Sequence, residues 1–413
     1  MNHKRFQRFK IFPDGHLALA LARLLLLKLG HESRPGKFAS IDGLRGYLAF
    51  SVFLHHSSIW YFYLRSGKWQ APPSNFYNNL GQASVALFFM ITALLFFSKL
   101  LDGRALGIDW IGLAVGRFFR IVPLYLVSIV LILFLVLASS HWQSVESLGS
   151  LARELFGWLT FRITPLNGFP ETFLVNASVT WTLSYEILFY LSLPVIGLAI
   201  GAKPALRVLA IGTCLIVMGA TAWRPSPIWL TPFFGGLAAA GMIRSQGFRR
   251  VAISPAATVI ALGCVAVAIL AYPSPLELVP MGLLAIAFSI IAGGSTIFGM
   301  LTTRTARALG EISYSIYLLH GMILFSLFDL VIGREAASRL SAIQHWECVL
   351  AVVPILVGLS FVTFLFIERP AIRAAPRAAS RLKSLFLSIG GTRKITVAIP
   401  AGGRRVAEPP EAQ

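Results

Sequence analysis

Four ionisable side chains lie inside one otherwise apolar stretch near the start of the chain, SIDGLRGYLAFSVFLHH at residues 40–56. In a helix, Arg45 and His56 are eleven residues apart and share one face, with about 16 Å between their Cα atoms along the axis. An arginine there can bind an anionic ligand, and an imidazole deeper in the helix can act as a base or a nucleophile. Asp42 lies one turn before Arg45 and can pair with it, whereas His55 points about 100° away, towards a cavity or a packing neighbour. The plainer alternative for His56 is a hydrogen-bonded residue in a helix interface.

A second group of charges lies in VGRFFRIVPLY at residues 115–125, just before an apolar segment. Arg117 and Arg120 are three residues apart, so a helix places them on one face. Two guanidinium groups at a membrane interface suit a phosphorylated ligand, because each can bind phosphate oxygens through two hydrogen bonds. Ordinary basic anchors that contact lipid phosphates would look the same in the sequence.

A carboxylate lies within the apolar segment SVTWTLSYEILFYL at residues 178–191. Glu186 must either pack against an arginine or histidine of another helix or remain protonated in an apolar site. Ser184 offers a hydroxyl group nearby. A bond between helices that only stabilises the bundle is the alternative.

Two later segments carry polar groups on apolar helices. In GEISYSIYLLHG at residues 310–321, Ser313, Tyr317 and His320 fall along one helix face, which can line a cavity facing the first helix or hold a packed histidine. The sequence Glu-Arg-Pro at residues 368–370 predicts the end of the last membrane-spanning helix, because proline stops a helix and the acid and base can pair.

The composition is that of an integral membrane protein. Of 413 residues, 56% are hydrophobic and 13% charged, and the mean hydropathy is +0.74, outside the range of soluble domains. The formal charge of +19 does not indicate nucleic-acid binding, since the basic residues cluster in termini and short loops, as membrane topology requires. Three cysteines with no CxxC pair and no histidine at ligand spacing predict neither a disulfide framework nor a metal site.

Hydropathy predicts an all-α, polytopic transmembrane bundle with about ten spans and both termini in the cytoplasm, which places most basic residues inside. The region 140–180 is then the longest stretch outside, and its segment 151–166 is too short and polar to be an eleventh span. The predicted parts are a cytoplasmic segment with an amphipathic helix (1–37), a membrane domain (38–372) and a basic, disordered cytoplasmic tail (373–413). The predicted spans are 41–64, 80–101, 119–139, 181–202, 205–223, 228–244, 252–272, 278–299, 310–332 and 347–367.

Taken together, these segments resemble the acyltransferase 3 family, integral-membrane O-acyltransferases of bacteria. One helix of the family has an arginine and a histidine separated by ten residues. DGLRG followed by His56 is similar to this pattern, with Arg45 as the arginine. RFFRIVPLY resembles its cytoplasmic Arg-x-x-Arg segment, although Val122 stands where an aromatic residue is common. WTLSYEILFYL, ISYSIYLLH and ERP resemble the later signatures, in family order over residues 38–372. The chain looks like the form without an added extracytoplasmic domain.

The resemblance implies transfer of an acyl group, most often acetyl, from acyl-CoA on the cytoplasmic side to a hydroxyl group at the other face. Arg45, Arg117 and Arg120 would then bind the donor, and Asp42 would fix Arg45. His56 would be the general base or carry the acyl group covalently. The ring would be oriented, or charge stabilised, by Glu186 or Tyr317, with the remaining polar residues named above as supports.

The same resemblance implies a multi-pass protein of the bacterial inner membrane that modifies the cell envelope. Its partners would be membrane lipids and a surface glycan or glycolipid, such as lipopolysaccharide, with no nucleic acid and no metal. The oligomeric state stays open, a homo-oligomer included. The alternative from another class is a glycan or lipid transporter or flippase that uses the intramembrane arginine, histidine and glutamate as a proton relay.

Overall fold

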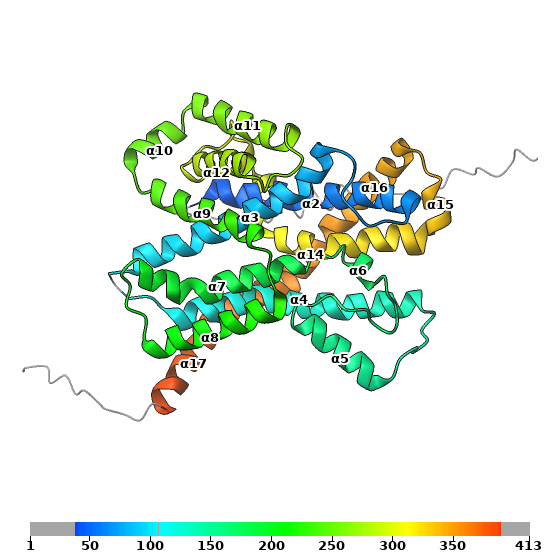
Figure 1. Ribbon diagram of the computed structural model, residues 1–413, viewed down its shortest axis with the longest axis horizontal. Helices are drawn as coiled ribbons and strands as arrows, with labels where there is room; N and C mark the ends of the chain where they lie inside the picture. Colours follow the sequence, from blue (N-terminus) through cyan, green and yellow to red (C-terminus); the bar gives the residue numbers. More distant parts are fainter. Residues whose placement is uncertain (1–37, 106, 390–413) are drawn as a thin grey trace, which may run out of the picture.

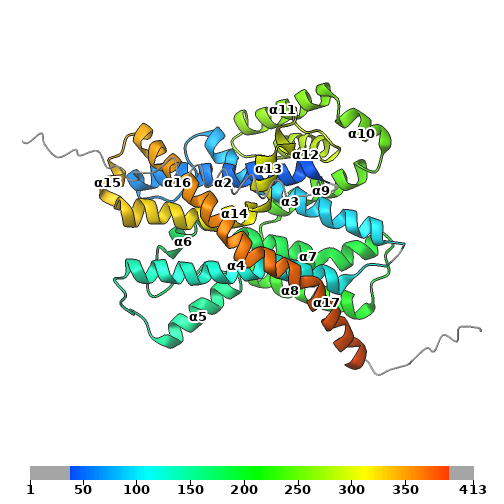
Figure 2. The same ribbon diagram turned by 180° about the vertical axis from the view of Figure 1, so that it is seen from behind.

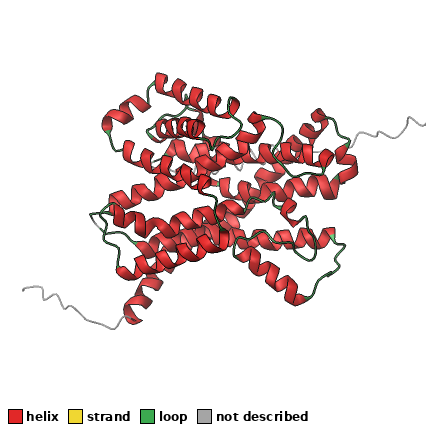
Figure 3. Cartoon of the chain, viewed as in Figure 1, coloured by secondary structure: helices red, strands yellow, loops and turns green. Residues whose placement is uncertain are grey.

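The computed structural model describes residues 38–105 and 107–389, which form helices and no β-strand (Figure 3). The amphipathic helix predicted within 1–37 lies outside these residues. The longer helices are α2 (Ala39–Ser66), α3 (Asn75–Gly103), α4 (Trp110–Ser139), α5 (Leu148–Leu159), α7 (Trp181–Ala199), α8 (Leu206–Trp223), α9 (Thr231–Met242), α11 (Pro255–Leu270), α12 (Leu278–Ala292), α14 (Ser313–Phe325), α16 (Ala342–Thr363) and α17 (Arg369–Ile389). Shorter turns of helix are α6 (Thr172–Val175), η1 (Pro227–Leu230), α10 (Gln246–Ala252), η2 (Met300–Thr302), α13 (Arg304–Glu311), η3 (Ser326–Val331), α15 (Arg334–Ser338) and η4 (Phe364–Glu368).

The helices form two groups that meet around the middle of the bundle (Figure 1). One group contains α2 and α3 with α9, α11 and α12 packed beside α3, and α14 and α16 beyond α2. The other contains α4, α7 and α8, with α5 folded back beside the far end of α4. The continuous helix of α16 and α17 runs diagonally across both groups and packs along α4 (Figure 2). Residues far apart in the sequence therefore meet where α2, α3, α4, α7, α14 and α17 converge.

All ten predicted spans fall on helices. Within the described part of the chain, six helices are long and apolar enough to cross a membrane, or seven if α10 and α11, bent by 75°, count as one. The helix α2 is long enough, at 28 residues, but its histidines and hydroxyl groups make it less apolar. The structure thus shows an all-helical protein with several membrane-spanning helices, while the count of ten and the cytoplasmic termini remain predictions.

The glycines of the DGLRG segment allow α2 to touch its neighbours backbone to backbone. A Cβ atom added at Gly43 would come within 1.8 Å of the Leu301 carbonyl oxygen in η2. One added at Gly310, in α13, would come within 1.8 Å of the Asp42 carbonyl oxygen. Small residues permit such close approach of helices in membranes. This contact fixes the start of α2, and with it the position of Arg45.

The predicted outer region 140–180 contains α5, which has only 12 residues and is too short to cross a bilayer, as expected for segment 151–166. The Asn167 side chain ties the region together, because its amide donates to the Gln143 carbonyl (2.8 Å) and its oxygen accepts from the Val145 N–H (3.0 Å).

An ionic cluster anchors the same region to the bundle. Arg334 in α15 lies 2.5 Å from the Glu171 carboxylate and also binds Asp329. The Tyr63 hydroxyl, at the end of α2, donates to Glu171 at 2.9 Å. Although burial disfavours its charge, hydrogen bonds to both carboxylates raise the pKa of Arg334, so this guanidinium keeps its charge at neutral pH.

The prediction that the Glu-Arg-Pro sequence ends the last helix is wrong. The helix continues through one π turn, η4, into α17, and Pro370 is the second residue of α17. The altered bonding register of a π turn accommodates a residue that has no backbone N–H. The chain is also helical up to Ile389, so the first part of the tail at 373–413 is ordered as a helix rather than disordered; residues 390–413 lie outside the described part.

Candidate active site

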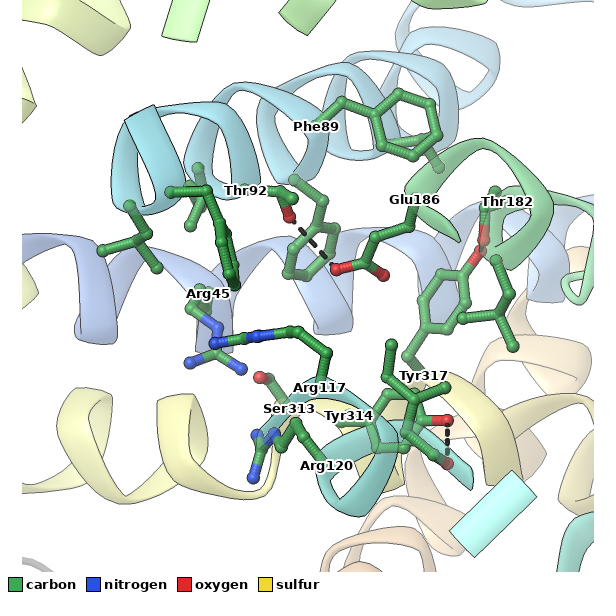
Figure 4. Close-up of a pocket in the computed structure, with 17 residues that line it drawn as sticks. Arg45, Phe89, Thr92, Arg117, Arg120, Thr182, Glu186, Ser313, Tyr314 and Tyr317 are labelled. Carbon is green, nitrogen blue, oxygen red and sulfur yellow. Dashed lines mark hydrogen bonds between the residues drawn. The ribbon is translucent and has the colours of Figure 1, made fainter. Parts of the chain in front are cut away.

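A cavity of about 170 Å³ lies where α2, α3, α4, α7 and α14 converge, and all three predicted donor-binding arginines line it. Arg45 comes from α2, and Arg117 and Arg120 come from successive turns of α4. Figure 4 shows their guanidinium groups gathered on one side of the cavity. Three positive charges brought together in this way can attract an anion.

Each α4 arginine is held by a different contact. The Arg117 guanidinium lies over the Phe96 ring, 4.3 Å from its centroid, in a cation–π contact. Arg120 Nη1 lies 3.1 Å from Glu368 Oε2, whose side chain is fully buried. That approach lacks hydrogen-bond geometry, so the pair is held by charge alone. The N–H groups of Arg120 therefore stay free of Glu368 and can bind a ligand.

The arrangement of the predicted acids differs from the simplest expectation. Asp42 lies close enough to Arg45 and Arg120 to interact with them electrostatically. Within the described residues, however, it forms no ion pair with Arg45 within 4.0 Å. Glu186 lies in the cavity wall, where one carboxylate oxygen accepts from the Thr92 hydroxyl (3.2 Å) and from the Tyr190 hydroxyl. Glu186 is thus placed with the arginines rather than beside His56 (Figure 4).

His56 and His320 form a hydrogen-bonded pair between α2 and α14. His56 Nδ1 lies 3.0 Å from the Val52 carbonyl oxygen and 3.1 Å from His320 Nε2. His320 Nδ1 lies 3.2 Å from the Ile316 carbonyl oxygen. A carbonyl oxygen only accepts, so each Nδ1 carries a proton, and His320 Nε2 accepts from His56. In the neutral ring this leaves the lone pair of His56 on Nε2, ready to take a proton or to attack a carbonyl carbon.

Tyr317 separates the arginine cavity from this histidine pair. Its ring lines the cavity, and the ring centroid is 6.1 Å from that of His320. Its hydroxyl bonds to the Thr182 hydroxyl (2.8 Å) and donates to the Val179 carbonyl (3.1 Å). His56 is not among the residues that line the cavity. The predicted site therefore has two parts, the arginine-lined cavity and the histidine pair, which we call the histidine compartment, with Tyr317 between them.

A family model described as an acyltransferase domain matches residues 38–367, which include every predicted site residue. The chain belongs to the acyltransferase 3 family. The resemblance drawn from the sequence motifs is thereby confirmed. Neither a curated protein nor a solved structure matches the chain. Family membership and the apolar helices together make this protein a multi-pass membrane acyltransferase.

Two of the residues predicted to support the acyltransferase site pack elsewhere. His55 is buried against α3, where its Nδ1 lies 2.7 Å from the Tyr77 carbonyl oxygen. A Cβ atom added at Gly81 would fall 2.3 Å from the His55 ring, so the fit is close. Ser184 donates to the Trp181 carbonyl of its own helix at 2.6 Å. The rings of His55, His56 and His320 do not form a metal site, because no cluster of three or more potential metal ligands occurs within 38–105 and 107–389.

Sequence reasoning missed two residues that the acyltransferase site brings in. Glu368 is the counter-charge of Arg120, and it accepts from the Ser315 hydroxyl, which in turn accepts from Thr363 at 3.0 Å. Trp69, in the connection after α2, stacks on the His56 ring at a centroid distance of 6.3 Å and an angle of 17°. An acid at the inner end of the last span, opposite an Arg-x-x-Arg segment, was the signal for Glu368. No signal marked Trp69, because loop contacts depend on the fold.

Proposed function

We propose that this protein transfers an acyl group, with acetyl as the expected group, from acyl-CoA to a hydroxyl group of a cell-surface glycan or glycolipid such as lipopolysaccharide. The proposed place of the reaction is the bacterial inner membrane. One observation carries the proposal: three arginines from two helices converge on a cavity that ends at Tyr317, directly beside a histidine pair. An anion site next to a base is what transfer from a phosphorylated thioester donor requires.

The arginine cavity is the proposed place for phosphate groups of the donor. Three acids lie near these arginines: Glu186 in the cavity wall, Glu368 beside Arg120, and Asp42 near Arg45 and Arg120. Among the described residues only Arg120 pairs with one of them within 4.0 Å, so Arg45 and Arg117 can direct their charge towards an anionic donor. With its phosphates held there, the pantetheine arm would extend towards Tyr317 and bring the thioester to the histidine compartment.

The proposed chemistry uses the lone pair on His56 Nε2. In the general-base route, Nε2 takes the proton of the acceptor hydroxyl while the oxygen attacks the thioester carbonyl carbon. The carbon–sulfur bond then breaks, and the proton passes from the imidazolium to the departing thiolate, which gives the ester and free CoA thiol. His320, which accepts from His56 Nδ1, stabilises the positive ring that forms.

The covalent route begins with attack of Nε2 itself on the thioester carbonyl carbon. CoA thiolate leaves, and an acyl-imidazolium forms on His56. The acceptor hydroxyl then attacks its carbonyl carbon and releases the neutral ring, and the hydroxyl proton ends on the thiolate, which gives the ester and free CoA thiol. The two routes differ in one observable. Labelled acyl-CoA supplied without acceptor labels the protein only in the covalent route.

The test is transfer of labelled acetyl from acetyl-CoA in membranes that contain the protein, followed by analysis of surface polysaccharide for ester-linked label. His56→Ala should abolish transfer, whereas the matched change at His141, an exposed histidine of the outer region, should leave it intact. Label that persists in His56→Ala at equal expression would refute the role of His56. Transport of a glycan without any incorporation of label would favour the transporter hypothesis.

A further inference from the structure

A second, larger hollow lies at the end of the bundle where α3 finishes, α4 begins and α17 passes both (Figure 1, Figure 2). Its volume is about 610 Å³, within the range of about 300–1,000 Å³ typical of small-molecule sites. The wall formed by α3, α4 and their connection has little side-chain bulk, because four glycines line it: Gly103, Gly107, Gly112 and Gly116. We call this hollow the α3–α4–α17 groove. Because glycine has no side chain, a small-molecule ligand in the groove could lie close to the backbone of α3 and α4.

The groove adjoins the arginine cavity through one aromatic ring. Phe96 lines the arginine cavity, and Arg117 lies over its ring at 4.3 Å. Lys99, one turn further along α3, lines the groove and also lies over the Phe96 ring, at 5.4 Å. An extended anionic ligand could therefore contact the groove and the arginine cavity at the same time.

The charges that line the groove favour an anion. Lys99 and Lys383 contribute two positive charges and Asp109 one negative charge, which leaves one net positive charge. Lys383 Nζ donates to Asp109 at 2.6 Å, and this hydrogen bond lowers the pKa of the Asp109 carboxyl despite some opposing desolvation. The pair holds Lys383 at the rim, where its remaining N–H groups can bind another acceptor. The positive N-terminal end of α4, capped by Asp109, opens onto the same space.

We propose that the α3–α4–α17 groove binds the nucleotide end of the acyl-CoA donor, with Lys99 and Lys383 in contact with its ribose 3′-phosphate. This inference rests on the proposed function and assigns the donor an order along the protein. The nucleotide lies in the groove, the diphosphate passes Phe96 and lies at the arginine cluster, and the pantetheine arm extends from there and places the acyl group at Tyr317.

The test compares two donors in the purified full-length protein. Acetyl-CoA carries the nucleotide, whereas the acetyl thioester of N-acetylcysteamine has only the end of the arm. Lys99→Ala and Lys383→Ala should each raise KM for acetyl-CoA about fivefold to tenfold, as expected for a partly exposed phosphate contact. The same variants should leave KM for the short thioester unchanged.

Two further variants sharpen the comparison. Asp109→Asn removes the one negative charge of the groove and should lower KM for acetyl-CoA, the opposite sign to the lysine variants. Arg377→Ala, on an exposed position of α17 that does not line the groove, is the matched control and should have no effect. If the wild type is active but the lysine variants keep normal KM for acetyl-CoA, the groove proposal is overturned. A wild type that uses neither donor would overturn the proposed function itself.

Discussion

The buried ion pair between Arg120 and Glu368 gives a quantitative prediction. Its atoms lie 3.1 Å apart, with 17% of the arginine side chain and none of the glutamate side chain exposed. Coulomb's law with an effective dielectric constant of about 20 gives about 5 kcal/mol for unit charges at this distance. Removal of one partner from a buried pair costs about 3–5 kcal/mol, because the other charge stays buried. In Glu368→Gln the new amide still accepts from Ser315, so we expect a loss near about 3 kcal/mol.

A double-mutant cycle measures this pair. The wild type, Arg120→Gln, Glu368→Gln and the double variant are compared by thermal unfolding in detergent at pH 7. Each single variant should lower Tm by about 6 °C, at about 2 °C per kcal/mol for a chain of this size. The double variant should unfold at a higher temperature than either single variant, because it leaves no charge buried and unpaired. Losses that simply add in the double variant would refute the reasoning, since they would mean that the two charges do not interact.

The same substitution separates structure from donor binding. If Glu368 orients Arg120 for the donor, Glu368→Gln should raise KM for acetyl-CoA. Glu368→Asp keeps the charge, so its KM should lie between that of Glu368→Gln and that of the wild type. Both effects should appear at temperatures well below Tm. An unchanged KM in a folded Glu368→Gln protein would limit Glu368 to stability.

Three other changes test separate features of the protein. Gly310→Ala places a Cβ atom 1.8 Å from a backbone oxygen of α2 and should abolish folding or lower Tm by about 6 °C or more, whereas Gly282→Ala, where nothing lies within 4 Å, should be silent. His320→Ala removes the acceptor for the Nδ1 proton of His56, the proposed base, and should lower kcat about tenfold or more with little change in KM for the donor; an unchanged kcat would contradict the proposed role of His320. The folded pKa of Asp109 lies below its unfolded value, so its contact with Lys383 contributes stability above about pH 4 and loses it as pH falls through the folded pKa. Both side chains are about half exposed, so the stability difference between wild type and Asp109→Asn should be small, below about 1 kcal/mol, and should shrink as the pH falls below about 4.

The positions of the helices and the shared face of Arg117 and Arg120 could be predicted, because they depend on local patterns, whereas the place of Arg45 beside them followed only from the family resemblance. Runs of apolar residues of bilayer length identify helices, and Arg117 and Arg120 share a face through their spacing alone. The Tyr317 wall could not be predicted, since it depends on how α14 is rotated against the outer region. Glu368 was misinterpreted for a related reason: local rules favour helix termination before proline, and only the packing of α17 along α4 shows that the acid meets Arg120.

The Tyr317 wall also concerns the membrane in which the protein lies. A polar cavity that joined the two faces would hold water, and water would let protons and ions pass and dissipate the gradients that the cell maintains. Tyr317 is only 8% exposed, and its hydroxyl is occupied by Thr182 and Val179, so packed side chains stand between the arginine cavity and the histidine pair. Under the proposed function, transfer across such a seal would move an acyl fragment while the bilayer stays tight to ions.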